Sequence, residues 1–460
     1  MTHINSLPAA ILERAFKHSL DAYDLTSWSW QSQLQLLAVC RQWREIAQPH
    51  VYGMGFIKLR EEFGYDSDCS DSGTDGDESY VVVDTNLGKI AENGRTHWVK
   101  NMHIVLLWPL NPLAYIDEVI RKLQAGNSQW PSVAKLTIWL TSSTCDLDTA
   151  ALKGEPLDSA IIDAARVLSD LLPSVVRLNI RAYTLNGLAE IFVSQLTGRC
   201  APQLRTLKCN VPLPLASLHF SDTLAHLDLQ FGPETGRLLS QVHAGSLQSI
   251  VLSNVPFDFT WRYFVGDGAD GKDNVTFHQL ETLSLCYAGH LNKHRDAGIV
   301  DDPCCLHFPK LKNIIIQGCP EYCEILHAKT YPRKLNSVSI AGPYAAIRAL
   351  ATMDIVSADS LLVSITSVGN QDLVDGFYET ANRLYGRLLT SFWSKLVIPR
   401  CSQSLDPRQI SWTNISELVC RDHIEFNSLV DLIPRLPRAK KLSFAQITFD
   451  KAPLDVVEES

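Results

Sequence analysis

The sequence predicts an α/β protein, with a small helical module at its N-terminus followed by a solenoid whose concave side is a parallel sheet. An apolar template recurs along the chain after residue 95. Within each copy the last apolar positions alternate with polar ones, as a short strand requires. Helix-like stretches separate several copies. Strand, turn and helix in repetition favour a solenoid, in which each unit packs against its neighbours.

The template reads apolar-x-x-apolar-x-apolar. Its steps run from 20 residues, between Leu204 and Leu224, to 42 residues, between Val133 and Val175. The last two apolar positions of the copies are Met102/Ile104, Leu136/Ile138, Leu178/Ile180, Leu207/Cys209, Leu227/Leu229, Ile250/Leu252, Leu283/Leu285, Ile314/Ile316, Val338/Ile340, Val363/Ile365 (the weakest), Leu396/Ile398, Leu418/Cys420 and Leu442/Phe444. The predicted helices are Leu113–Leu123, Ala160–Leu172, Leu188–Leu196, Tyr344–Met353 and Leu373–Leu389.

These repeats resemble leucine-rich repeats, whose period is ~20–29 residues. The spacing is irregular, and most copies lack the Asn that follows the strand in the regular pattern. An unrelated α/β fold is therefore the alternative to an irregular leucine-rich-repeat solenoid.

The N-terminal fifty residues carry many large apolar side chains over three expected short helices, beginning at a Leu-Pro step and ending in VCRQWREIAQPHVY. A segment of ~50 residues buries only a marginal core of its own. Some of this apolar surface should therefore need a partner to cover it.

This pattern, from Ile4 to Tyr52, resembles the F-box, through which substrate receptors dock on the Skp-type adaptor of a cullin ubiquitin ligase. The resemblance implies that the adaptor is bound by Leu7, Pro8, Ile11, Leu12, Val39, Cys40 and Trp43. With the repeats, it implies an F-box/leucine-rich-repeat substrate receptor, non-catalytic and without a cofactor, with an unknown protein substrate. The alternative is an interaction scaffold whose N-terminal helices only cap the solenoid.

The substrate is expected on the concave sheet, where the polar positions of the template face solvent. These are Asn101, His103, Lys135, Thr137, Arg177, Asn179, Arg181, Thr206, Lys208, His226, Asp228, Ser249, Thr282, Ser284, Asn313, Ser337, Ser339, Lys441 and Ser443. Lys135, Arg177, Arg181 and Lys208 form a candidate substrate-binding patch for an acidic or phosphorylated segment. A merely solvated surface is the simpler interpretation, and occupancy by the chain's own acidic loop is a third.

That acidic loop, residues 66–79, contains no bulky apolar residue and is expected to be disordered. Its Asp and Glu residues supply six of the nine net negative charges, so the remainder carries a charge of only -3 and gives no support for nucleic-acid binding. Ser72 and Thr74 each precede an Asp by three residues and are candidate phosphorylation sites. A solubilising spacer is the alternative.

Four regions follow: an F-box-like helical module over 1–52, a linker over 53–95, the solenoid over 96–450 and a tail over 451–460. No apolar run reaches the ~20 residues of a membrane span, and the N-terminus does not resemble a secretory signal. We therefore expect no membrane partner and a cytoplasmic or nuclear location. The 12 scattered cysteines, with no CxxC pair, are typical of reduced, buried thiols.

Two further patterns are weak signs of chemistry. The Cys and His residues near 304–327 lack the spacing of a zinc finger, and the GDGADG run at 266–271 lacks the helix start that a dinucleotide site requires. The sequence thus predicts no metal, no cofactor and no enzyme, with zinc-dependent catalysis kept as a remote third class.

Overall fold

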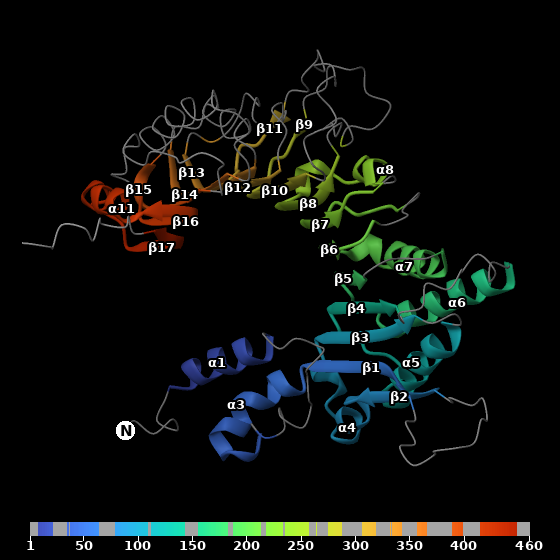
Figure 1. Cartoon of the computed structure of the whole chain (residues 1–460). Helices are drawn as coiled ribbons and strands as arrows, with labels where there is room; N and C mark the ends of the chain where they lie inside the picture. The colour runs from blue at the N-terminus through green and yellow to red at the C-terminus, as the bar shows by residue number, and fades with distance from the viewer. Residues whose placement is uncertain are drawn as a thin grey trace, which may run out of the picture. The chain divides into compact units, whose positions relative to one another are not determined.

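The structure, a computed structural model, divides the chain into two compact units (Figure 1). Unit 1 comprises residues 1–223 with 233–235, and unit 2 comprises 224–232 with 236–460. The described residues are 8–21, 35, 37–63, 79–108, 112–142, 155–182, 187–212, 218–232, 235–256, 264, 275–287, 306–318, 332, 334–342, 357–365, 389–398 and 415–448.

Unit 1 is built on a sheet with strand order β6-β5-β4-β3-β1-β2. All neighbouring strands are parallel except the antiparallel pair of β1 and β2 at one edge. The strands are β1 (Met54–Phe63), β2 (Ser79–Thr85), β3 (Asn101–Trp108), β4 (Lys135–Ser142), β5 (Arg177–Ala182) and β6 (Thr206–Cys209).

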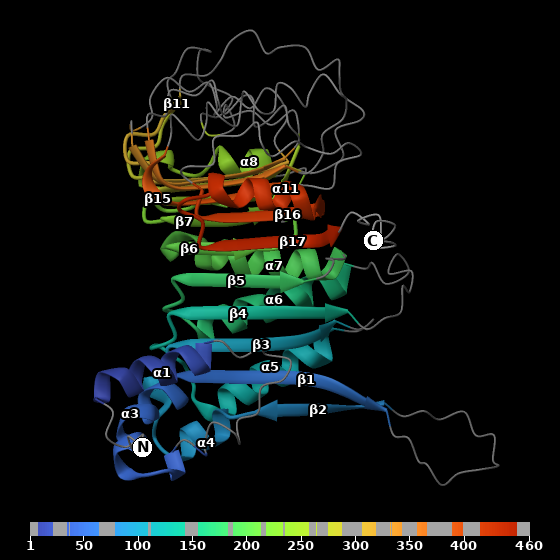
Figure 2. The same cartoon turned by 60° about the vertical axis from the view of Figure 1, so that its left-hand side comes forward.

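Helices cover one face of this sheet, behind the strands in Figure 2. They are α4 (Leu87–Glu92), η2 (Thr96–Trp98), α5 (Leu113–Gly126), α6 (Glu155–Leu171), α7 (Gly187–Cys200) and η4 (Ala201–Gln203). The apolar positions of the template, such as Leu136 and Ile138, are buried on this side because α5, α6 and α7 carry matching apolar residues. This layer is the core of unit 1.

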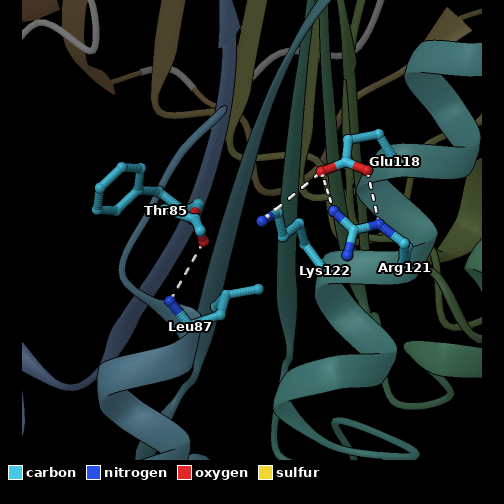
Figure 3. Close-up of polar contacts among 6 residues, drawn as sticks. Thr85, Leu87, Glu118, Arg121 and Lys122 are labelled. Carbon is cyan, nitrogen blue, oxygen red and sulfur yellow. Dashed lines mark hydrogen bonds and ion pairs between the residues drawn. The ribbon is translucent and has the colours of Figure 1, made fainter. Parts of the chain in front are cut away.

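Two groups of polar contacts lie at this helical layer, one at the start of α4 and one on α5 (Figure 3). Thr85 Oγ1 accepts a hydrogen bond from the Leu87 amide at 3.2 Å, where α4 starts, and donates to the Phe56 carbonyl at 2.8 Å. On α5, Glu118 pairs with Arg121 at 2.6 Å and with Lys122 at 3.7 Å. The hydrogen bonds from Arg121 lower the pKa of Glu118 from its usual range.

The N-terminal helices α1 (Ala9–Asp21) and α3 (Arg41–Val51) pack at the opposite face, over β1. Cys40 caps α3, and its Sγ accepts a hydrogen bond from the Trp43 amide. Gly53 joins α3 to β1 where a Cβ atom would meet the Pro49 carbonyl oxygen, so only glycine fits this short connection. The helices are thereby held close to the first strand of the sheet.

Unit 2 is a sheet of parallel strands. Their order is β7 (His226–Gln230), β8 (Ser249–Val255), β10 (Thr282–Tyr287), β12 (Asn313–Gln317), β13 (Lys334–Gly342), β14 (Ser357–Ile365), β15 (Leu389–Ile398), β16 (Glu417–Glu425) and β17 (Lys441–Thr448). The remaining described elements are α8 (Thr235–Leu239), η5 (Ala244–Ser246), β9 (Val275–Thr276), β11 (Leu306–His307), α11 (Phe426–Leu432) and η9 (Ile433–Arg435).

The predicted α/β class and the mostly parallel sheet are confirmed. The last two apolar positions of each of the thirteen template copies fall within a strand. Equivalent positions also pair in register: Leu136 lies beside Leu178, and Ile250 lies beside Leu283. The register changes at β14, where Val363 pairs with Ile340 on one side and with Leu396 on the other.

The prediction that residues 53–95 form a linker is wrong. Most of the described residues in this range belong to two strands and a helix. Residues 54–63 and 79–85 form β1 and β2, and residues 87–92 form α4. β1 was missed because Gly55 and the charged residues from Lys58 onward interrupt its apolar pattern, while its pairing with β3 supplies hydrogen bonds that composition does not show. β2 carries the apolar run 80–83 but directly follows the acidic loop, and its partner is β1. The acidic loop lies outside the described residues, except for Ser79, which begins β2.

Three predicted helices are confirmed, as α5, α6 and α7. The predicted helix 344–353 lies outside the described residues, as does 373–389 except for Leu389, which begins β15. The predicted tail 451–460 lies outside them too. None of the described helices has the length and apolar character needed to cross a bilayer.

Candidate functional site

An apolar cluster joins the N-terminal helices to the sheet of unit 1. Its buried members are Leu12, Phe16, Leu37, Ala47, Val51 and Phe56, with Trp43, Ile46, Tyr52 and Met54 packed around them. Phe56 belongs to β1, so the strand itself closes the core of the helical module. The helices therefore rest on the sheet that follows them in the sequence.

Trp43 and Phe16 tie α3 to α1 within this cluster. Their rings meet edge to face, with centroids 5.0 Å apart, an arrangement that aromatic pairs favour. The indole nitrogen of Trp43 is buried without a hydrogen-bond partner. Arg44 Nε donates to the Leu37 carbonyl at 2.9 Å and so holds the residues before α3 against that helix.

The residues matched to the adaptor interface divide into two groups. Pro8, Ile11 and Val39 are exposed, Ile11 by 52% and Val39 by 51%. Cys40 and Trp43 are half-buried, and Leu7 lies outside the described residues. Leu12 is only 2% exposed, because it points into the cluster. The placement of Leu12 on a docking surface is therefore wrong in this arrangement.

The expectation that a foreign partner must cover the apolar side of the helical module is also corrected in part. Phe56 and the half-buried Met54, both from β1, pack into the apolar cluster on that side. The composition of residues 1–52 could not show this, because the covering strand follows them at residue 54. Among the described large apolar residues of the module, Ile11 and Val39 remain exposed for a partner.

The second candidate surface lies on the same face of the sheet as α1 and α3. Phe56, which contacts those helices, pairs with His103 of β3, and His103 pairs with Thr137 of β4. Since side chains alternate between the faces of a strand, Lys135 in β4 shares this face with Thr137. The same face therefore runs from the N-terminal helices across β3 to β6.

Cations flank a polar row on this face. The row is His103, Thr137, Asn179 and Lys208, paired in register across β3, β4, β5 and β6. Lys135 and Arg177 pair with each other two residues before the row, on β4 and β5. Arg181 lies two residues after the row, on β5. We call Lys135, Arg177 and Arg181 the basic strip. Arg177 and Arg181 are exposed, and Lys135 is half-buried.

Two polar atoms in the row lack hydrogen bonds. Thr137 is 2% exposed, and neither its Oγ1 nor the Nδ1 atom of His103 has a hydrogen-bond partner. Burial, followed by the positive charges of Lys135 and Arg181, lowers the pKa of His103 to about 4. His103 is therefore neutral at pH 7. Both residues were predicted to face solvent, but Thr137 is buried and His103 is half-buried.

Of the other predicted site residues, Lys208 lies on this same face, in register with Asn179. Lys208 takes part in an interaction of its own and is not counted in the basic strip. Ser72 and Thr74 lie outside the described residues. Of the Cys and His residues near 304–327, only His307 is described, and the GDGADG run is not. Within the described part of the chain, no three His, Cys, Asp or Glu residues gather as a metal site would require.

Sequence reasoning missed two asparagines whose side chains hydrogen-bond to strand backbone in unit 1. Asn86, which is fully buried, accepts from the Phe56 amide at 2.9 Å and donates to the Met54 carbonyl at 2.8 Å. Asn210 does the same for Ala182, at 2.9 and 3.0 Å. Asn210 directly follows Cys209, the third apolar position of its template copy. This position in the template is a sequence signal by which Asn210 could have been found.

Two comparisons with known proteins find no relative of this chain. No family model matches it, and a search of curated proteins finds no significant match.

Proposed function

We propose that this chain is a non-catalytic substrate receptor of a Skp-cullin-type ubiquitin ligase. Its N-terminal helices bind the adaptor, and its irregular leucine-rich-repeat sheet binds the target protein. The contribution of such a receptor is proximity, because a lysine of the target is held near the ubiquitin-charged enzyme.

The observation that carries the proposal is the exposure of Ile11 and Val39. In the described part of unit 1, the only exposed large apolar residues are these two and Ile162. Ile11 and Val39 both belong to the segment that resembles the F-box. Each leaves about half of a large apolar side chain in water, and burying such a side chain contributes about 1.5–3 kcal/mol in full. An adaptor surface can recover part of that free energy.

One observation favours a second function, that of an interaction scaffold whose N-terminal helices cap the sheet. Leu12, Phe16 and Phe56 lie in a single cluster, so α1 already covers the sheet of unit 1 at β1. A cap of this kind protects the apolar end of a repeat array and needs no adaptor. The two functions differ in whether Ile11 and Val39 have a partner.

A cellular experiment separates them. The full chain carries an affinity tag, is expressed in cells that contain Skp-type adaptors and cullins, and is purified for mass spectrometry. A second sample carries Ile11→Asp with Val39→Asp. A matched control carries Ile433→Asp with Val430→Asp, because these residues of unit 2 are exposed to a similar degree, 53% and 48%.

The receptor function predicts that adaptor and cullin are recovered with the unmodified chain and with the control, and are both lost from the Ile11→Asp/Val39→Asp variant. Candidate targets that bind the sheet should remain in all three samples. Recovery of the same partners with all three chains and of no adaptor with any of them contradicts the receptor function and supports the scaffold.

A further inference from the structure

The last repeat of unit 2 exposes an unusual amount of apolar surface. Five of the eight exposed large apolar residues in the described part of the chain lie within residues 426–448, on α11, η9 and β17. They are Phe426, Val430, Ile433, Leu442 and Ile447. A concentration of this kind indicates a surface that another segment covers.

Leu442 occupies a template position that the preceding repeats bury. It pairs in register with Leu418 of β16, which is 1% exposed, whereas Leu442 is 37% exposed. Leu283 and Ile314, at the same position of β10 and β12, are fully buried. The strand β16 is followed and contacted by α11, whereas the described part of the chain ends with β17, at Thr448. The exposure of Leu442 therefore indicates that a covering segment belongs after β17.

The helical segment α11–η9, beside β16 in Figure 1, is apolar on two sides. Leu429 and Leu432 are buried. Phe426, Val430 and Ile433 recur at helical spacing on the other side and are exposed. A helix that is apolar all round is typical of a buried position, so this exposed side also needs a cover. We call Phe426, Val430, Ile433 and Leu442 the terminal apolar surface.

The charge of this region is opposite to that of the tail that follows it. Residues 426–448 contain four Lys or Arg and one Asp, a net charge of +3, whereas residues 451–460 contain one Lys and three Asp or Glu, a net charge of -2. The bases lie between η9 and the start of β17: Arg435, Arg438, Lys440 and Lys441, the last of which pairs with Glu417. Two of the acids, Glu458 and Glu459, are the last charged residues of the tail.

We propose that the tail, residues 451–460, packs against β17 and α11–η9 and covers the terminal apolar surface. Because β16 and β17 are parallel, their connection through α11–η9 runs back along the sheet, and the tail takes the equivalent path after β17. Leu454, Val456 and Val457 then meet the terminal apolar surface. Glu458 and Glu459 come to lie beside the bases at the start of β17, where opposite charges attract.

The length of the tail allows this path. An extended residue spans about 3.3 Å, so the ten residues of the tail reach about 33 Å, whereas the eight residues of β17 span about 26 Å. Pro453 has a fixed φ and no amide hydrogen, which suits an extended segment that rests on a surface. A second copy of this chain fits less well, because it would bring two positively charged regions together.

Hydrogen exchange of the full chain tests the contact directly. Mass spectrometry measures the amides of residues 454–459 and compares them with the same residues in a free peptide of sequence KAPLDVVEES. Packing should slow their exchange at least about tenfold relative to that peptide, because exchange then requires the tail to open. Tenfold dilution of the chain should not change the rate, since the contact lies within one molecule.

Two double variants identify the surface that the tail meets. In Val430→Asp/Ile433→Asp, two acids replace apolar contacts opposite an acidic segment, so the tail should exchange about as fast as the free peptide. In Ile11→Asp/Val39→Asp, the matched control, the same kind of change lies in unit 1 and the tail should keep its protection. The first variant should still recover the adaptor and the second should not, so the two readouts separate this contact from the ligase function.

Charge reversal tests the direction of the tail. Glu458→Lys/Glu459→Lys and Arg438→Glu/Lys440→Glu should each reduce the protection at least about threefold, and their combination should restore most of it. Each chain is compared with the free peptide of its own tail sequence. Two exposed acids of unit 1 supply the matched control, Glu92→Lys with Asp170→Lys, which should leave the protection unchanged. A combination that restores nothing contradicts the antiparallel path.

Three results overturn the contact itself: a tail that exchanges in the full chain as fast as the free peptide, full protection in Val430→Asp/Ile433→Asp, or protection that falls on dilution. The last result would assign the surface to a second copy of the chain. Because no adaptor or target is present in the exchange experiment, each of these results leaves the ligase function standing.

Discussion

Trp43 of α3 packs edge-on against Phe16 of α1, with the ring centroids 5.0 Å apart. Both rings belong to the cluster that Phe56 of β1 closes. The aromatic pair therefore couples the placement of the candidate adaptor-binding helices to the first strand of the sheet.

Replacing Phe16 should loosen both helices. Phe16→Ala leaves a cavity beneath Trp43, and a change of this kind in a packed core costs about 3–5 kcal/mol. Hydrogen exchange of the α3 amides and urea unfolding followed by circular dichroism measure the loss. Ile11→Ala, a truncation on the exposed side of the same helix, should cost less than about 1 kcal/mol. Equal effects of the two changes would mean that α1 does not rest on the cluster.

Asn86 should be essential to the start of β1. In Asn86→Ala the Phe56 amide and the Met54 carbonyl lose their partners, at a cost of about 2–4 kcal/mol. The exposed Asn93 is the control, since its side chain donates only to the Lys89 carbonyl and water can replace it. Chemical unfolding of both variants tests this, and a loss no greater for Asn86→Ala than for Asn93→Ala contradicts it.

His103 should make the stability of unit 1 fall in mild acid. Its folded pKa of about 4 lies below the ordinary 6.5, so between these values the unfolded chain binds more protons than the folded chain. The free energy of unfolding is therefore highest above pH 6.5 and decreases as the pH falls toward 4. Between pH 7.5 and 5 the contribution of this group is about 2 kcal/mol.

The variant His103→Asn isolates this contribution, because it cannot take up the proton while other titrating groups remain. Urea unfolding at pH 7.5 and 5 should show that the stability of the variant falls less than that of the unmodified chain, by about 2 kcal/mol. An identical fall in both proteins contradicts the burial of a neutral imidazole beside Lys135 and Arg181.

The repeat strands could be predicted from the sequence because each depends on a local pattern. Leu136 and Ile138, for example, alternate with polar residues in a way that only a half-buried strand explains. The α5 and α6 helices were predictable for a similar reason, since their apolar residues recur on one face at the helical period.

The missed features depend on contacts between distant segments. β1 and β2 were read as linker, although β1 pairs with β3, 47 residues further along the chain. Leu12 was placed on a surface because its partner Phe56 lies outside the helical module. His103 and Thr137 were read as solvated because the alternation of a strand assigns a side chain to a face but does not say what covers that face.

The most direct test of the receptor function is a calorimetric titration of the purified full chain with a purified Skp-type adaptor. The account predicts one-to-one binding by the unmodified chain and by Val430→Asp/Ile433→Asp, and its loss in Ile11→Asp/Val39→Asp, whose circular dichroism should be unchanged. A folded, unmodified chain that shows no binding to the adaptor at about 50 µM would contradict it.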